Sequence, residues 1–176
     1  MKRLLTGVLL LGMLFNTQLC QAMSPEQYIE SIAPYAQRVK EHGLFPSVAI
    51  AQSCRETGFG KHLDAQDVRG QSIRQYNNVL GKKWRGGWYF EKLTWEGSGA
   101  GRHTIVGKFQ AYKTLKDCFE DYANNIMRNP AYRHKDTSNL YTFIHSIAPS
   151  YATDNPWDYA TGVIRIIEKY NLTQYD

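Results

Sequence analysis

The feature of the sequence that most constrains the fold is a β-like segment, residues 71–112, set between stretches with helical periodicity. Aromatic and β-branched residues alternate with polar ones in this segment, around the glycine-rich stretch 97–101. The alternation predicts two strands, 88–96 and 104–112, joined by that stretch as their turn. Helices on both sides of one small antiparallel insertion predict an α+β domain, mainly α, with a ligand cleft between the helical body and the β-lobe.

Capping residues and apolar spacing predict the helices. Ser24 with Gln27, and Thr114 with Asp117, have the spacing of a capping box. Pro34 should kink the first helix or split it in two, because proline lacks the amide donor that a helix interior needs. The predicted helical ranges are 24–43, 46–58, 114–130, 140–149 and 155–170.

The first 22 residues have the pattern of a secretory signal peptide. A positive start, the apolar run 4–15 and a polar stretch that ends at Ala22 follow one another, and the apolar run is too short to span a bilayer. Cleavage after Ala22 would leave residues 23–176 as one exported domain, periplasmic or secreted, without stable membrane insertion. The alternative is a lipoprotein site at Cys20, which would hold the product on a membrane.

Charge and metal-ligating residues exclude several function classes. The formal charge of +5 falls to +3 when Lys2 and Arg3 leave with the signal peptide. Basic residues are scattered rather than clustered with aromatic ones, which disfavours a nucleic acid partner. The five histidines are dispersed, so no metal or other cofactor is predicted. Cys54 and Cys118 are either a disulfide or two buried free thiols.

Glu56 is the strongest candidate for a catalytic residue. It lies in the last turn of the predicted helix 46–58, where the partial negative charge of the helix terminus disfavours an ionised carboxylate. Phe59 and the apolar helix face would add desolvation, which also favours the protonated acid. Such an acid can donate a proton to a leaving oxygen. The local sequence is equally compatible with a surface carboxylate paired with Lys61 or Arg55.

The predicted insertion carries two further carboxylates and a group of aromatic residues. A glycosidase usually needs a second carboxylate, and Glu91 and Glu96 fall on opposite faces of the first predicted strand. Sugar rings stack on aromatic side chains, so the aromatic group favours a carbohydrate groove. The alternative is packing of the lobe on the body. The aromatic group consists of Trp84, Trp88, Tyr89 and Trp95.

These motifs together resemble the glucosaminidase family of peptidoglycan hydrolases, glycoside hydrolase family 73, which includes flagellum-associated wall hydrolases and autolysins. The stretch PSVAIAQSCRETGFGKH at 46–62 is similar to the signature helix of that family, whose glutamate is the catalytic acid and falls on Glu56. Further segments resemble family elements in the same order. They are NNVLGKKW at 77–84, TWEG at 94–97, KFQAY at 108–112, NPAYR at 129–133, and SYATD at 150–154 with Tyr159 after it.

The resemblance implies a lysozyme-like fold and an endo-β-N-acetylglucosaminidase that cleaves peptidoglycan glycan strands after N-acetylglucosamine. It implies that Glu56 is the general acid, that Glu96 rather than Glu91 is the second carboxylate, and that Tyr151 lines the active site. The expected substrate-binding or groove-supporting residues are Asn78, Trp84, Trp88, Tyr112 and Tyr132.

Four positions depart from the family pattern and leave the substrate preference open: Arg55, Thr57, Phe59 and Gln110. Two rivals act on the same polymer, a lytic transglycosylase and a muramidase. A third is a wall-binding protein without catalytic activity. The sequence leaves open the stereochemical outcome, the biological process, the peptide-stem preference, the oligomeric state, and whether an envelope-spanning machine or an inhibitor protein is a partner.

Overall fold

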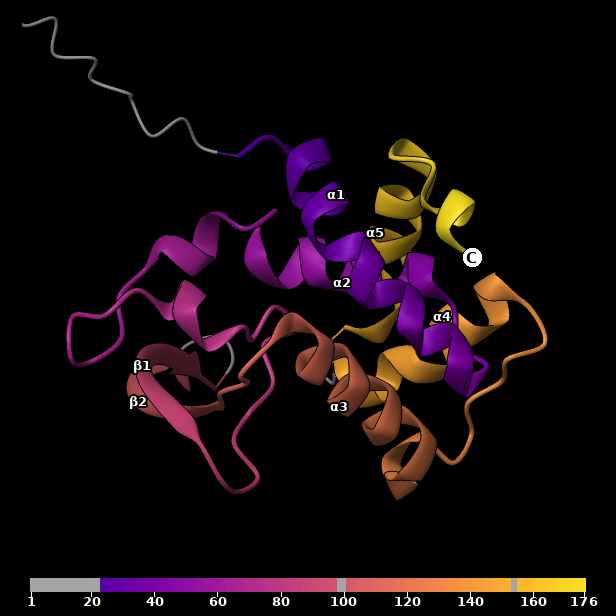
Figure 1. Cartoon of the computed structure of the whole chain (residues 1–176). Coiled ribbons are helices and arrows are strands. Elements are labelled where there is room, and N and C mark those ends of the chain that lie inside the picture. The colour runs from indigo at the N-terminus through magenta and orange to yellow at the C-terminus, as the bar shows by residue number, and fades with distance from the viewer. Residues whose placement is uncertain (1–22, 98–100, 153–154) are drawn as a thin grey trace, which may run out of the picture.

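The computed structural model describes residues 23–97, 101–152 and 155–176, with the backbone but not the side chain of Glu96. A body of packed helices lies beside a lobe made of one antiparallel hairpin (Figure 1). This confirms the predicted α+β architecture, mainly α. The predicted signal peptide, the centre of the predicted turn and the end of the 150–154 motif lie outside the described residues.

The helices and strands follow the predicted ranges closely. The body contains α1 (Pro25–Ala36), η1 (Gln37–His42), α2 (Pro46–Thr57), α3 (Leu115–Arg128), η5 (Pro130–Tyr132), α4 (Leu140–Tyr151), α5 (Pro156–Lys169) and η6 (Leu172–Tyr175). Between α2 and α3 come η2 (Lys61–Asp64), η3 (Ile73–Tyr76), β1 (Tyr89–Glu96) and β2 (His103–Gln110). In the described ranges, no helix has both the length and the apolar character needed to cross a membrane.

The first helix begins and breaks as predicted. Ser24 and Gln27 form the capping box of α1. The α-helix ends at Ala36, two residues after Pro34, and the chain continues as the 3₁₀ helix η1 before Gly43 ends it in a left-handed conformation. The missing amide of Pro34 removes one hydrogen bond and its ring crowds the preceding turn, so the predicted split takes the form of a change in helix type.

Helix α2 is the centre of the body, and every residue from Pro46 to Cys54 is buried. No side chain of the preceding loop caps its first turn. The carboxylate of Asp176 accepts hydrogen bonds from the Ser47 amide at 2.8 Å and from the Ser47 hydroxyl at 2.7 Å. An anion is favourable at a helix N-terminus, so a residue distant in sequence completes α2. Gly58 ends the helix with a φ of 57°.

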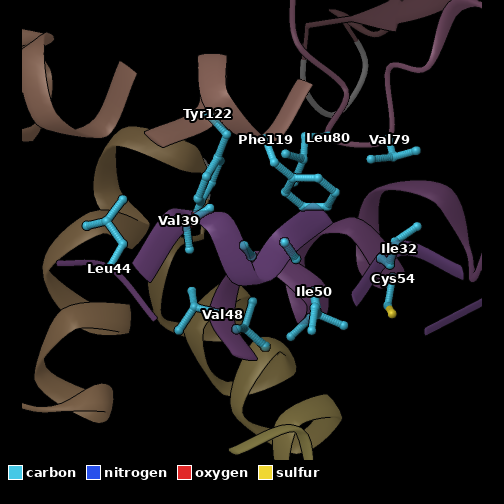
Figure 2. Packing of buried hydrophobic residues seen from close by; sticks show 14 of the residues in the cluster. Ile32, Val39, Leu44, Val48, Ile50, Cys54, Val79, Leu80, Phe119 and Tyr122 are labelled. Carbon is cyan, nitrogen blue, oxygen red and sulfur yellow. The ribbon is translucent and has the colours of Figure 1, made fainter. Parts of the chain in front are cut away.

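Side chains from several helices surround α2 and form the main core. Figure 2 shows Phe119 and Tyr122 of α3 on one side of this packing and Val48 and Ile50 of α2 on the other. Cys54 of α2 and Cys118 of α3 are buried free thiols, so the disulfide alternative is not formed.

One predicted helix boundary is wrong in a way that matters for the site. The sequence suggested that the helix from Leu140 stops at Pro149, but α4 continues through this proline to Tyr151. Pro149 lies so near the end of α4 that its missing donor costs a single bond of the last turn, and Ala152 still donates to the Ala148 carbonyl at 2.8 Å. Tyr151 is therefore held on a helix.

The lobe has a small core of its own. In the hairpin, Phe90 lies opposite Phe109 and Glu91 opposite Lys108. The Tyr76 ring stacks on the Phe90 ring with centroids 4.5 Å apart, and Phe90 stacks on Phe109 at 5.7 Å. The buried cluster consists of Ile73, Tyr76, Phe90, Phe109 and Ala111.

Candidate active site

Glu56 lies in the last turn of α2, partly buried, and lines a cavity together with Lys92 and Trp95 of the lobe. Burial raises the pKa of its carboxyl above the ordinary value, while a hydrogen bond from Tyr159 and the positive charges of Arg55 and Lys92 oppose that rise. No salt bridge within 4.0 Å joins Glu56 to Arg55 or Lys61, both of which are described residues. The alternative of a paired surface carboxylate is therefore wrong.

A chain of hydrogen bonds, buried as far as Tyr159 and partly buried at Glu56, assigns different roles to the two carboxyl oxygens. The Tyr122 hydroxyl donates to Gln52 Oε1 at 2.6 Å, and Gln52 Nε2 donates to the Tyr159 hydroxyl oxygen at 3.2 Å. The only hydrogen of the Tyr159 hydroxyl is then free to point at Glu56 Oε1, 3.4 Å away. Because Oε1 acts as an acceptor, the acidic proton of Glu56 belongs on Oε2.

Oε2 lies against a glycine in the loop that leads to the lobe. A Cβ atom on Gly81 would come within 3.0 Å of Oε2, and Gly81 has a φ of 62°. Asn78 holds this loop: its amide nitrogen donates to the carbonyls of Lys82 at 2.9 Å and Gln110 at 2.8 Å, and its amide oxygen accepts from the Lys82 amide at 2.9 Å. Asn78 lines a small cavity together with Glu56 and Gly81, and both of its amide hydrogens are already used by backbone carbonyls.

Several adjoining cavities meet at Glu56. The one of about 370 Å³ is also lined by Leu80, Lys82, Tyr132 and Tyr151 among others, and one of about 990 Å³ by His62, Asp67, Lys92 and Trp95 among others. A further cavity, of about 550 Å³, shares Arg85, Asn125 and Asn129 with the first. Together they form an elongated trough between body and lobe, as the sequence predicted, with the acid near its middle.

The predicted tyrosines take different positions along this trough. Tyr151 lines the 370 Å³ cavity, stacks on Tyr159 with ring centroids 5.4 Å apart, and donates a hydrogen bond to the Leu80 carbonyl at 3.3 Å. Tyr132 is buried and lines the same cavity. Tyr112 is buried, does not line these cavities, and donates at 2.8 Å to Asp121, which lines the 550 Å³ cavity. Its supporting role stays a prediction.

The predicted aromatic groove is only partly assembled. Trp95 lines the 990 Å³ cavity with Glu56. Trp84 and Trp88 are 40% and 51% exposed and do not line the described cavities that contain Glu56. Trp84 donates to the Gly87 carbonyl, and Trp88 packs edge-on against Tyr76. A substrate contact for these two tryptophans stays a prediction.

The second carboxylate is placed only by its backbone. Glu96 is the last residue of β1, paired with His103, and its side chain lies outside the described part of the chain. Glu91 is 3.9 Å from Lys108 in an ion pair across the hairpin. The role predicted for Glu96 therefore stays a prediction.

Four residues of the site escaped the sequence analysis: Gln52, Lys82, Lys92 and Tyr159. Burial lowers the pKa of Lys82 to about 8, against the opposing charge of Asp121. Burial also lowers the pKa of Lys92. Gln52 gave the clearest signal, since it is a polar residue inside an otherwise buried helix. Tyr159 follows the family-like motif at 150–154, but the motif assigned it no role.

Comparison with known proteins identifies the family of the chain. The family model described as mannosyl-glycoprotein endo-beta-N-acetylglucosaminidase matches residues 33–172. Peptidoglycan hydrolase FlgJ of Vibrio parahaemolyticus is 31% identical over 155 residues, which cover 83% of this chain and 47% of that protein. Exo-glucosaminidase LytG of Bacillus subtilis is 29% identical over 158 residues, covering 85% and 52%. The chain thus spans about half the length of these relatives.

Solved structures show the same fold. The catalytic domain of the autolysin Auto from Listeria monocytogenes has a TM-score of 0.69 and 29% identity, covering 86% of this chain and 87% of that one. The truncated glycoside hydrolase domain of Salmonella typhimurium FlgJ has a TM-score of 0.64 and 22% identity, covering 84% and 98%, and it supports the fold alone. The family match extends over most of the chain, and on that ground the chain belongs to the glucosaminidase family of glycoside hydrolases, family 73.

Proposed function

We propose that this chain is an exported peptidoglycan hydrolase that cleaves glycan strands after N-acetylglucosamine, with Glu56 as the general acid. One observation carries the proposal: a carboxyl whose pKa burial raises lies in a trough, with Oε1 engaged by Tyr159 and Oε2 directed to Gly81. Membership of the glucosaminidase family supports the bond type, and the similarity to the peptidoglycan hydrolase FlgJ supports peptidoglycan as the substrate.

The reaction follows from the two oxygens of Glu56. Oε2 gives its proton to the glycosidic oxygen as the bond between that oxygen and the sugar C1 breaks, and Glu56 becomes a carboxylate. The Tyr159 hydrogen bond and the Lys92 charge both stabilise that carboxylate. Water then supplies a hydroxyl to C1 and returns a proton to the enzyme.

The step at C1 has two routes within this proposal. In one, Glu96 at the end of β1 activates the water or stabilises the positive charge that develops on the sugar. In the other, the 2-acetamido group of the substrate attacks C1 and Glu96 is dispensable. Comparing the Glu96→Gln variant with the wild type separates them, since only the first route predicts a large loss of activity.

A muramidase is the second candidate, because a probable N-acetylmuramidase of Lactococcus lactis is 32% identical over 166 residues, covering 87% of this chain and 35% of that protein. The two enzymes would share an acid and a trough and would differ in which sugar ring occupies the site of C1 attack. The products distinguish them, because each leaves a different sugar at the new reducing end.

The decisive experiment is product analysis of purified wall sacculi digested by the wild type and by Glu56→Gln. After borohydride reduction, mass spectrometry should find reduced N-acetylglucosamine at the new ends. Glu56→Gln should lower the rate by about 10²- to 10⁴-fold. Glu91→Gln is the matched control: it neutralises a carboxylate that pairs with Lys108, and it should keep the wild-type rate.

Each other outcome rejects the proposal in a specific way. Reduced muramic acid indicates a muramidase, and anhydro-muramic ends indicate a lytic transglycosylase. Soluble wild-type protein that binds sacculi without releasing products indicates a wall-binding protein. For export, the N-terminal sequence of the protein recovered outside the cytoplasm should begin at Met23, and a lipid-modified Cys20 would contradict cleavage after Ala22.

A further inference from the structure

Arg55 precedes Glu56 in the sequence and packs on Tyr159, the residue that donates a hydrogen bond to Glu56. The Cζ atom of its guanidinium lies 4.9 Å from the centroid of the Tyr159 ring, a distance typical of a cation–π contact. Its ion pair with Asp158 is long, at 3.8 Å, and the Asp158 side chain is 68% exposed. Such an exposed pair contributes little, so the ring contact fixes Arg55 more than the carboxylate does.

A glycine in α5 makes room for this guanidinium. A Cβ atom on Gly162 would fall 3.0 Å from Arg55 Cζ and still closer to Arg55 Nη1. Gly162 lies inside the helix Pro156–Lys169, where glycine is a poor helix former and calls for a packing reason. The absent side chain supplies that reason, because the guanidinium lies in the notch it leaves, one helical turn from Tyr159.

We infer that Arg55 is a positioning residue for the acid: seated over Gly162, its guanidinium packs on the Tyr159 ring and holds the phenol hydroxyl against Glu56 Oε1. This inference rests on the proposed function, in which Glu56 is the acid. The hydrogen bond concerned is long, 3.4 Å, so a small shift of the ring breaks it. A proton would then be free to settle on either oxygen, whereas the proposed reaction needs it on Oε2.

Arg55 is one of several charged or titratable groups around Glu56. From α2 it lowers the pKa of the acid, as does Lys92 from β1. Tyr159 of α5 donates the hydrogen bond and Tyr151 of α4 packs beside it. The cavities that Glu56 lines are also lined by Lys61, His62, Asp67, Lys82, Lys83 and Arg85.

The kinetic test compares substitutions that remove the charge of Arg55, the planar shape of its guanidinium, or the space beside Gly162 in which the guanidinium lies. Arg55→Met should lower kcat roughly 10-fold with little change in KM, less than the 10²-fold that a misplacement of 1 Å can cost. Arg55→Lys should recover only part of that loss, because ammonium cannot stack flat on the ring. Gly162→Ala should lower kcat while maintaining or raising thermal stability, since alanine favours the helix and displaces only the guanidinium. Asp158→Asn is the control and should behave as wild type.

A double-mutant cycle shows whether Arg55 acts through Tyr159. In the Tyr159→Phe background, Arg55→Met should cause no further loss of kcat, because the hydroxyl it positions is gone. The alkaline limb of the pH profile should still move to higher pH, because a positive charge near the acid has been removed. An unchanged kcat in Arg55→Met, or the same loss in both backgrounds, overturns the inference.

A measurement without substrate separates this inference from the proposed function. In protein labelled with ¹³C at the glutamate carboxyl, the signal that Glu56→Gln deletes should titrate at higher pH in Arg55→Met than in wild type, and at the wild-type pH in Asp158→Asn. The Tyr159 Cζ signal should shift in Arg55→Met. If the wild type releases no products, the proposed function fails, yet these signals still report on Arg55. A Tyr159 signal unmoved by Arg55→Met overturns the inference alone.

Discussion

The helical body and the β-lobe are stabilised by cores of different size, and residues of both surround the acid Glu56. The body surrounds the buried helix α2 with side chains from α1, α3, α4 and α5. The chain of hydrogen bonds from Tyr122 through Gln52 and Tyr159 to Glu56 lies within the body. The lobe has one hairpin and a separate cluster of five buried residues. A region with few buried contacts opens at lower free energy than the main core. The acid is thus fixed to the stable region, while the less stable region supplies Lys92 and Trp95 opposite it.

The largest expected effect tests whether the two regions unfold separately. Phe143 in the body is fully buried and Phe90 in the lobe is 2% exposed. Removing either ring should lower the free energy of unfolding of the region that contains it by about 3–5 kcal/mol. Phe143→Ala should lower the free energy of global unfolding. Phe90→Ala should abolish hydrogen-exchange protection of the hairpin at 89–110 while amides of α2 stay protected. Equal loss of protection in both regions would show a single cooperative unit.

The next effect, about 2 kcal/mol, concerns the start of the central helix. Asp176→Ala removes the carboxylate that accepts two hydrogen bonds from Ser47, leaving the first turn of α2 without its acceptor. Denaturant unfolding should show the loss, and Asp176→Asn should recover part of it because one amide oxygen remains. The lobe amides should lose no more protection than the body amides. A wild-type midpoint for Asp176→Ala would mean that the cap contributes nothing to α2.

The sequence predicted best what depends on neighbouring residues. The helix 46–58, its glycine end and the position of Glu56 all follow from local spacing, and the structure has them. The contacts that define the site do not follow from local spacing. Asp176 and Ser47 are 129 positions apart, and Glu56 and Tyr159 are 103 apart. Local periodicity carries no information on which distant polar groups meet in a core.

The tryptophans and Pro149 show two other limits of sequence reasoning. Composition could indicate an aromatic lobe, but not that Trp84 and Trp88 would lie outside the cavities at Glu56 while Trp95 lines one. Proline is a reliable signal against the interior of a helix and a weaker one in its last turn, where α4 passes through Pro149 and carries Tyr151 to the trough.

A smaller effect is expected from substitution of Gly81, in the loop between body and lobe. Gly81→Ala adds a Cβ 3.0 Å from Glu56 Oε2, at a φ of 62°. Gly70→Ala is a matched control, since Gly70 has a φ of 78° and a Cβ added there would meet nothing within 4 Å. Both should lose about 1–2 kcal/mol of stability from backbone strain. Only Gly81→Ala should also lower kcat, roughly 10-fold, because it displaces the oxygen that carries the proton. Equal activity in the two variants would contradict the assignment of Oε2.

The smallest expected effect is a gain in stability when the acid is removed. Burial raises the pKa of Glu56 in the folded state above its value of 4.5 in the unfolded chain. The folded protein therefore binds this proton more tightly, and stability falls as pH rises from about 4.5 through the folded pKa, after which the cost is constant. Glu56→Gln carries no such cost. Its Tm should match the wild type at pH 4 and exceed it by roughly 2–4 °C at pH 8.

Glu91→Gln provides the comparison from the lobe. Glu91 is partly exposed and paired with Lys108, so its replacement removes a weak attraction and should give no gain in Tm at pH 8. A gain in Tm seen only in Glu56→Gln and only at high pH would show that the ionised Glu56 carboxylate lowers the stability of the body. The Glu91 carboxylate of the hairpin has no such effect. If Glu56→Gln were no more stable than wild type at pH 8, the fold would not disfavour the ionised form, and the argument for Glu56 as the proton donor would lose its physical basis.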